Sequence, residues 1–194
     1  MDALTFLRND HESVLGMLES LERGRGTGEA EVKARGDLVT SLVMAESQHE
    51  AIEEQFFWPA VRRALPDGDN LADRAVSQED SAKELLQQLE DFGAGSREFE
   101  EALDRFIPAA RAHIEFEQSQ VWPRLSEAQS PAELEQLGDK MQAAKKFAPT
   151  RPHPNTPSNP ATLKSAGLLA AVLDKVRDFV GGRRAHQPPT PPPT

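Results

Sequence analysis

Hydrophobic side chains recur at spacings of three and four residues in four long stretches of the chain. These stretches cover residues 2–21, 30–64, 71–92 and 96–128. This spacing marks one face of an α-helix, so each stretch predicts a helix with one buried face. The connections GRGTGE, PDGDN and GAGS are short and rich in turn residues. Because long helices joined by short turns run antiparallel, residues 1–128 predict an all-α, up-down-up-down antiparallel four-helix bundle.

The chain beyond the predicted bundle consists of several segments of different composition. Residues 129–148 predict an additional helix, because Ser130 is a good N-cap and a proline follows it. Residues 149–160, PTRPHPNTPSNP, predict an extended Pro-rich strap that covers part of the bundle. Residues 161–180 predict a C-terminal amphipathic helix, and residues 181–194 predict a disordered tail.

Polar residues interrupt two of the apolar faces in a repeated frame. HEAIEEQFFWP, residues 49–59, and HIEFEQSQVWP, residues 113–123, match with an offset of 64 residues. Each segment places a glutamate four residues after a histidine, so both side chains lie on one helix face. Trp58 and Trp122, each followed by a proline, are expected to plug the end of the bundle. The side chains that the pattern turns inward are His49, Glu53, His113 and Glu117.

The other two long helices each add one inward polar residue, His11 on the first and Glu79 on the third. An ionised carboxylate in an apolar core is costly unless it is paired or binds a metal. The central stripes contain no lysine or arginine. Six nitrogen and oxygen donors exceed a four-coordinate zinc site and suit two ions, with Glu53 and Glu117 free to bridge them. Ligands without sulfur favour iron or manganese over copper.

Other charged residues near these positions have a simpler interpretation. Glu46, Glu50 and Glu54 are expected to be solvated or to lie behind the ligands, with Glu50 and Glu54 facing away from the stripe. Asp80 and Lys83 are expected on the wetter face of the third helix. A metal-free bundle, in which the inward glutamates are protonated or bound to water, is the structural alternative to a metal site.

Composition narrows the classes of function. A net charge of -10 argues against binding to the phosphate backbone of nucleic acids. No apolar run is long enough to cross a bilayer, and the N-terminus lacks the layout of a signal peptide, so no membrane association and a cytoplasmic location are expected. The chain has no cysteine, so a metal must be held by histidines and carboxylates.

On these motifs, residues 1–128 resemble the hemerythrin-like (HHE cation-binding) proteins. The resemblance rests on His11, the two His-x3-Glu motifs followed by FFWP and VWP, and the segment QEDSAKELLQQLE. It implies an antiparallel four-helix bundle around two iron ions per chain, bridged by carboxylates and an oxo or hydroxo group. Terminal ligands would be His11, His49, Glu79 and His113, with Glu53 and Glu117 as bridges.

The sequence departs from the family pattern in its third helix, where members usually have a histidine and this chain has Glu79. A carboxylate in place of an imidazole favours ferric iron, which argues against reversible oxygen carriage. The chain is similar to histidine-poor, bacterial stress-type members, which implies chemistry with peroxide, oxygen or nitric oxide. If the protein is an enzyme, it is expected to be a catalase- or peroxidase-like oxidoreductase. The alternative is a non-enzymatic sensor of oxygen, nitric oxide or iron, or an iron-binding protein.

Overall fold

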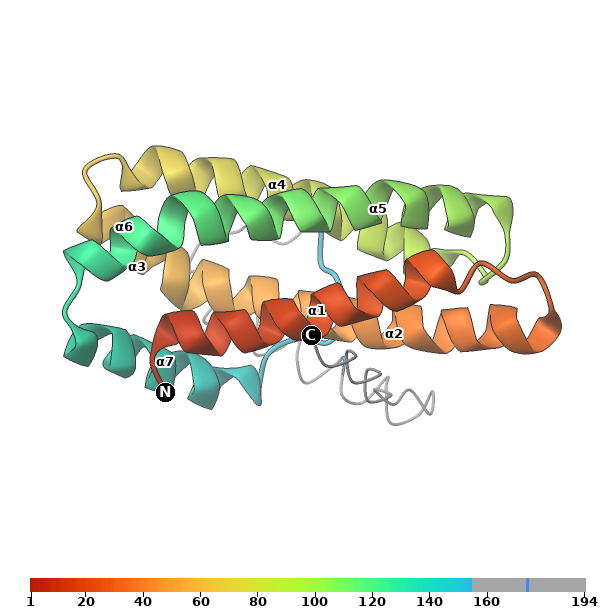
Figure 1. The fold of residues 1–194 in the computed structure, drawn as a ribbon, viewed down its shortest axis with the longest axis horizontal. Helices are drawn as coiled ribbons and strands as arrows, with labels where there is room; N and C mark the ends of the chain where they lie inside the picture. The colour runs from red at the N-terminus through yellow and green to blue at the C-terminus, as the bar shows by residue number, and fades with distance from the viewer. Residues whose placement is uncertain (155–173, 175–194) are drawn as a thin grey trace.

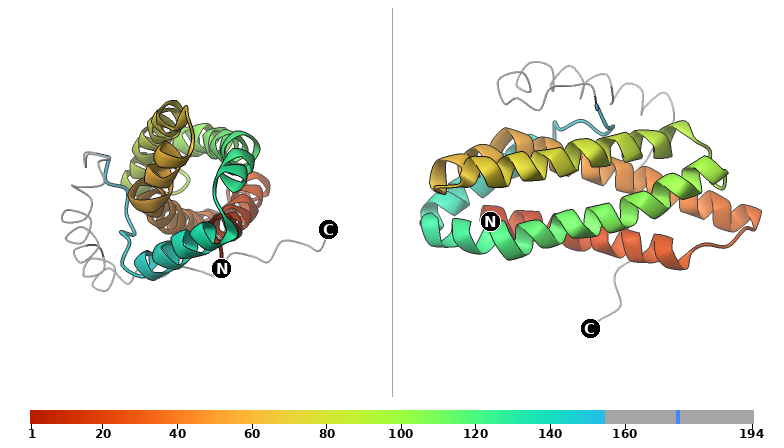
Figure 2. Two further views of the ribbon diagram at one scale, coloured as in Figure 1. Left: turned by 90° about the vertical axis from the view of Figure 1, so that its left-hand side faces the viewer. Right: turned by 90° about the horizontal axis from the view of Figure 1, so that it is seen from above.

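The predicted antiparallel four-helix bundle is confirmed by the structure, a computed structural model that describes residues 1–154 and Asp174. Figures 1 and 2 show four long helices packed side by side around a common axis. In chain order these are α1 (Ala3–Arg23), α2 (Glu29–Ile52), α4 (Gly68–Asp91) and α5 (Arg97–Phe116). None of the described helices is long and apolar enough to cross a membrane.

Side-chain caps fix where two of the long helices begin. The Asp2 carboxylate accepts a hydrogen bond of 2.9 Å from the Thr5 amide at the start of α1. The Ser96 hydroxyl accepts one of 3.2 Å from the Phe99 amide at the start of α5. These bonds satisfy amide groups that have no acceptor inside the helix. The turn before α5 includes Gly95 with a φ of 83°, a conformation that glycine adopts without strain.

The second and fourth predicted helices, residues 30–64 and 96–128, are not continuous α-helices. Each contains one π-helix, η1 (Glu53–Phe57) or η2 (Glu117–Val121), followed by a short helix, α3 (Trp58–Ala64) or α6 (Trp122–Ala128). Both interruptions keep the offset of 64 residues found in the sequence.

A proline follows each π-helix and accounts for the change in helix type. The Trp58 amide donates to the Glu53 carbonyl and the Trp122 amide donates to the Glu117 carbonyl, five residues back. The next residue, Pro59 or Pro123, has no amide proton to continue the α-helical pattern. Single π-turns of this kind are frequent at functional sites. Pro108, by contrast, lies inside α5 without ending it.

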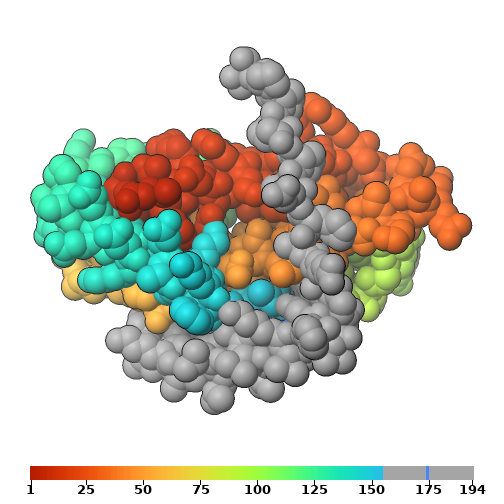
Figure 3. Space-filling model, turned by 90° about the horizontal axis from the view of Figure 1, so that it is seen from below, coloured from red at the N-terminus to blue at the C-terminus, as the bar shows by residue number. Residues whose placement is uncertain are grey.

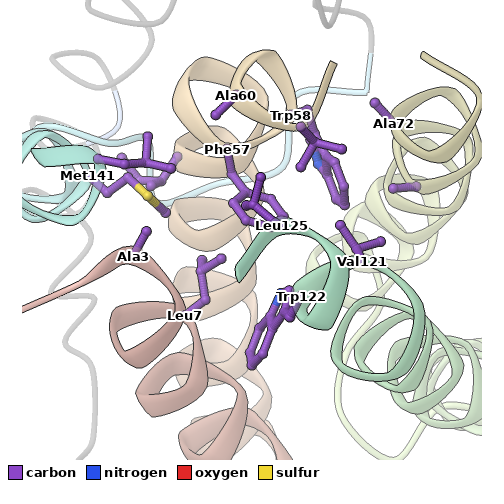
Figure 4. Packing of buried hydrophobic residues seen from close by; sticks show 14 of the residues in the cluster. Ala3, Leu7, Phe57, Trp58, Ala60, Ala72, Val121, Trp122, Leu125 and Met141 are labelled. Carbon is purple, nitrogen blue, oxygen red and sulfur yellow. The ribbon is translucent and has the colours of Figure 1, made fainter. Parts of the chain in front are cut away.

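The apolar core is divided into two clusters. The first lies at the end of the bundle that contains α3 and α6, and includes Leu7, Trp58 and Trp122 (Figure 4). The second lies toward the other end and includes Leu42 and Leu103. The boundary between the clusters falls near His11 on α1, His49 on α2 and Glu79 on α4, and between His113 and Glu117 at the end of α5. The polar residues therefore form a layer across the bundle between two apolar blocks.

Helix α7 (Pro131–Lys145) is an addition to the bundle and packs on α1 and α2. Figure 3 shows it lying beside α1 on the face seen there. The Ser130 hydroxyl accepts from the Glu133 amide while the Glu133 carboxylate accepts from the Ser130 amide, a capping box. A Cβ on Gly138 would lie 2.2 Å from the Met1 carbonyl oxygen, so only glycine allows this close approach to the N-terminus.

The segment after α7 is described as far as residue 154. The buried carboxylate of Asp174 accepts hydrogen bonds from the amides of Thr150 and Arg151, and lies 3.1 Å from His153 Nε2. The predictions for residues 155–160, for the helix at 161–180 apart from Asp174, and for the tail at 181–194 concern residues outside the described part of the chain.

Candidate metal centre

The polar layer contains six ligand-type side chains, and the described residues place them in two groups that share two members. In the first group the ligand atoms of His11, His49, Glu53 and Glu117 all lie within 4.8 Å of one another. His11 comes from α1, His49 from the end of α2, and the two glutamates from the first residues of η1 and η2. His11 Nε2 lies 3.1 Å from His49 Nε2 and 3.4 Å from Glu117 Oε2. His49 Nε2 lies 3.3 Å from Glu53 Oε2.

The second group adds one residue from each of the other two helices. Glu79 of α4 and His113 of α5 join Glu53 and Glu117, again within 4.8 Å. His113 Nε2 lies 3.0 Å from Glu117 Oε1, 3.9 Å from Glu53 Oε2 and 4.0 Å from Glu79 Oε1. Glu53 and Glu117 therefore belong to both groups. On one side they face the imidazoles of His11 and His49, and on the other they face the His113 imidazole and the Glu79 carboxylate.

Hydrogen bonds among these side chains do not satisfy all of their polar atoms, whereas a pair of metal ions would. Among the described residues, both carboxylate oxygens of Glu53 and of Glu117, and Oε2 of Glu79, are buried without a hydrogen-bond partner. Such groups cost about 1–3 kcal/mol each when left unsatisfied, and more when charged. Two ions with oxygen and nitrogen ligands would supply the missing partners, so the donor set fits a dinuclear centre.

The far side of each imidazole also faces a polar partner. His49 Nδ1 lies 3.4 Å from Asp10 Oδ2, and the same aspartate pairs with Lys145 of α7. His11 Nδ1 lies 3.1 Å from the side-chain amide of Gln118. His113 Nδ1 lies 3.1 Å from Oε1 of Gln78. The oxygen partners of His49 and His113 accept from Nδ1–H, which orients those rings and leaves each Nε2 lone pair available to a metal. For His11 the neighbour of Nδ1 is Gln118 Nε2, which helps to hold the orientation of the ring.

Both tryptophans touch the site, which the sequence interpretation as end plugs did not include. The Trp58 indole N–H donates to Glu79 Oε1 at 2.5 Å. The Trp122 ring stacks on His11 with a centroid distance of 5.0 Å and an angle of 13°. The two rings also belong to the apolar cluster at the end of the bundle, so each has a packing role and a contact with a candidate ligand.

Burial and close charges shift the pKa values of the site residues in opposite directions. Burial raises the pKa of Glu79 to about 8 and holds that of Glu53 well above its ordinary value, where the nearby Glu117 charge adds to the effect. Burial would raise the pKa of Glu117 as well, but the His113 charge and the close contacts of Glu117 with the His11 and His113 rings keep it below the ordinary value. His113 shows the reciprocal effect: Glu117 raises its pKa against burial, which lowers it.

Of the two alternatives expected for Glu46, Glu50 and Glu54, solvation is wrong for this structure, and burial behind the ligands is left. Glu46, Glu50 and Glu54 keep only 7%, 3% and 5% of their surface exposed. Lys83 is also buried, contrary to its expected place on a wet face, and it pairs with Glu54 and with the exposed Asp80. Helix α2 packs against α1, α4 and α7, so it buries more of its circumference than one apolar stripe.

Comparison with known proteins gives three findings. The family model described as "Hemerythrin HHE cation binding domain" matches residues 2–125. An uncharacterized hemerythrin-like protein of Schizosaccharomyces pombe is 30% identical over 135 residues, which are 69% of this chain and 66% of that protein. The chain therefore spans slightly less than two thirds of that relative. A crystal structure of a hemerythrin HHE cation binding domain-containing protein from Mycobacterium kansasii matches with a TM-score of 0.63 at 21% identity, covering 90% of this chain and 99% of that one.

Proposed function

Because the chain belongs to the hemerythrin HHE cation-binding domain family, we propose that its polar layer holds two iron ions and reacts with small oxidants. The observation that carries the proposal is the pair of four-residue groups that share Glu53 and Glu117, with buried oxygens left unpartnered among the described residues. The oxidants we propose are hydrogen peroxide, nitric oxide and oxygen.

Each side chain has a distinct task in this proposal. His11 and His49 would be terminal ligands of one ion, Glu79 and His113 would be terminal ligands of the other, and Glu53 with Glu117 would bridge. Bound iron supplies Lewis acidity and electrons for reducing a small oxidant. The apolar clusters on both sides of the layer exclude bulk water. The chain contains no tyrosine, so tyrosyl radicals and tyrosine proton donors take no part.

The first test is the iron content of protein expressed with iron and purified without chelator. We expect about two irons per chain, as in other dinuclear helical bundles, and a sharp fall in Glu53→Ala or Glu117→Ala. Glu115→Gln, an exposed change on α5, is the matched control and is expected to keep the metal. A folded wild-type protein that holds little or no iron would overturn the proposal.

The second test is steady turnover of added peroxide, followed as oxygen release or as oxidation of a reducing dye. We expect turnover by the iron-loaded protein and its loss in His113→Ala. Iron-loaded protein without turnover would support the second candidate function, a non-enzymatic sensor or iron-binding protein. That candidate is favoured by the contacts from His49 through Asp10 to Lys145, which connect the site to α7.

A further inference from the structure

A small cavity adjoins the candidate metal centre on the side of its histidines. Its volume is about 20 Å³, and it lies between all four long helices, with His11 of α1 among its lining residues. A cavity of about 10–15 Å³ on this measure already admits one water molecule. The cavity is therefore large enough for one water or one ion and too small for an organic substrate.

One wall of the cavity consists of candidate ligands and the other of residues at the surface. His49, Glu79 and His113 line it on the inside. Ala109, which also lines it, is exposed, and Ala82 is half-buried. The cavity therefore lies between the metal-binding side chains and residues that reach the surface of α4 and α5.

Glu46 and Glu50 line this cavity between its two ends, and neither is used by the proposed centre. Glu50 keeps 3% of its surface exposed, and its Oε2 has no hydrogen-bond partner within the part of the chain that the structure describes. Within that part, no ion pair reaches either carboxylate. Burial raises the pKa of Glu50 and the charge of nearby Lys83 opposes this, but the ion pairs of Lys83 are with Glu54 and Asp80.

Two carboxyl groups on one cavity, one of them with a buried oxygen that lacks a partner among the described residues, offer oxygen ligands to a positively charged ion. A water molecule also fits the space and can hydrogen-bond to Glu50, but only a cation balances the charge once these groups are ionised, and an uncompensated buried charge is costly. A divalent cation fits the volume, and oxygen ligands suit first-row ions in their divalent state. Glu46 and Glu50 stand one helical turn apart on α2, so both face the same ion.

We propose that Glu46 and Glu50 form a loading site, which holds a divalent cation that has entered between α4 and α5 before it passes to the metal centre. This inference rests on the proposed function, because it needs a centre that takes up metal. The cation keeps its charge and oxidation state during the transfer. It exchanges the carboxylates of the loading site for the side chains of the centre.

The test compares rates of Fe²⁺ uptake by metal-free protein under nitrogen. Protein and Fe²⁺ are mixed, a chelator is added after set times, and protein-bound iron is counted after desalting. The double variant Glu46→Gln with Glu50→Gln is expected to fill about tenfold more slowly, since clefts of one charge raise local ion concentrations and association rates by about 10–10³. Its final iron content is expected to equal that of the wild type.

The matched control is the double variant Glu84→Gln with Glu115→Gln, which removes the same charge from exposed positions on α4 and α5. We expect it to fill at nearly the wild-type rate. The single variant Glu46→Gln, with a smaller change to the core, is expected to slow filling in part and decides the question if the double variant does not fold. Ala109→Leu narrows the opening without changing charge and is expected to slow uptake too.

Three results would overturn the proposal, and they separate it from the proposed function. Equal rates in wild type and in the Glu46 and Glu50 variants, with both filling completely, would remove the loading site and leave the centre intact. A lower final iron content in those variants would place the two glutamates in the centre itself. A wild type that takes up no iron would overturn both the centre and its loading site.

Discussion

Raising the pH is expected to destabilise the metal-free protein, because its buried carboxyl groups resist ionisation. Burial raises the pKa of Glu46 from 4.5 to about 7 and that of Glu79 from 4.5 to about 8. A group whose pKa is higher in the folded state binds its proton more tightly there. It therefore contributes stability at low pH, and that stability is lost as the pH rises through the folded value.

The size of the effect follows from the two pKa values. One pKa unit corresponds to about 1.4 kcal/mol. Between pH 6.5 and pH 8, Glu46 and Glu79 together lower the unfolding free energy by about 2 kcal/mol, which is about 4–8 °C in Tm for a chain of this size. The raised pKa values of Glu53 and His113 act in the same direction. The lowered pKa of His49 acts in the opposite direction, by about 0.4 kcal/mol at most over this window, because an unfolded histidine is half protonated at pH 6.5.

The assay is thermal unfolding followed by circular dichroism, with a chelator present, at both pH values. Glu46→Gln is expected to remove about a third of the dependence on pH, since Glu46, with a pKa of about 7, has already lost part of its proton at pH 6.5, whereas Glu79, with a pKa of about 8, is still mostly protonated there. Metal-loaded protein is expected to show the opposite slope, because metal binding requires deprotonated ligands. A metal-free Tm at pH 8 equal to or above that at pH 6.5 would refute the reasoning.

Three further outcomes are expected. Trp58→Phe removes the hydrogen bond to Glu79 and is expected to lower metal affinity about 10- to 100-fold in a chelator competition. Trp122→Phe is the control and is expected to leave the affinity nearly unchanged, because the buried N–H of Trp122 has no partner among the described residues. Lys83→Met leaves the Glu54 charge buried and unpaired and is expected to lower the unfolding free energy, measured in urea, by about 3–5 kcal/mol. Adding Glu54→Leu should restore most of this stability. A double variant no more stable than the single variant would contradict the ion-pair account. Removing bound metal with a chelator is expected to lower the Tm. If the free metal concentration was 100 times its Kd, the loss in unfolding free energy is about 2.7 kcal/mol. An unchanged Tm would count against a resident metal.

Hydrophobic spacing was sufficient to predict the bundle and to predict that six polar side chains face its interior. The prediction worked because an inward histidine or glutamate interrupts a regular apolar stripe, and helical geometry then places it. His11 and Glu79 are single interruptions, but four antiparallel helices bring them to the same level as the repeated pairs. That they bind metal remains a prediction, which the iron content will test.

The spacing could not predict the π-turns or the burial of Glu50. A proline after Trp58 signals that the hydrogen-bond pattern is disturbed, but it does not say whether the helix ends, kinks or gains a residue per turn. Glu50 lies beside the apolar stripe of α2, and its environment depends on how many helices pack on that side. Burial by several neighbours is a tertiary property, and a period counted along one helix does not contain it.

The positions of the two tryptophans give the molecule a built-in optical reporter. The chain has two tryptophans and no tyrosine, so its near-ultraviolet absorption and its emission come mainly from two indole rings. One ring donates a hydrogen bond to Glu79 and the other stacks on His11. Whatever fills the polar layer is therefore in the immediate surroundings of both chromophores. Intrinsic fluorescence should follow the filling of the centre in the unmodified protein, with no label and no added dye.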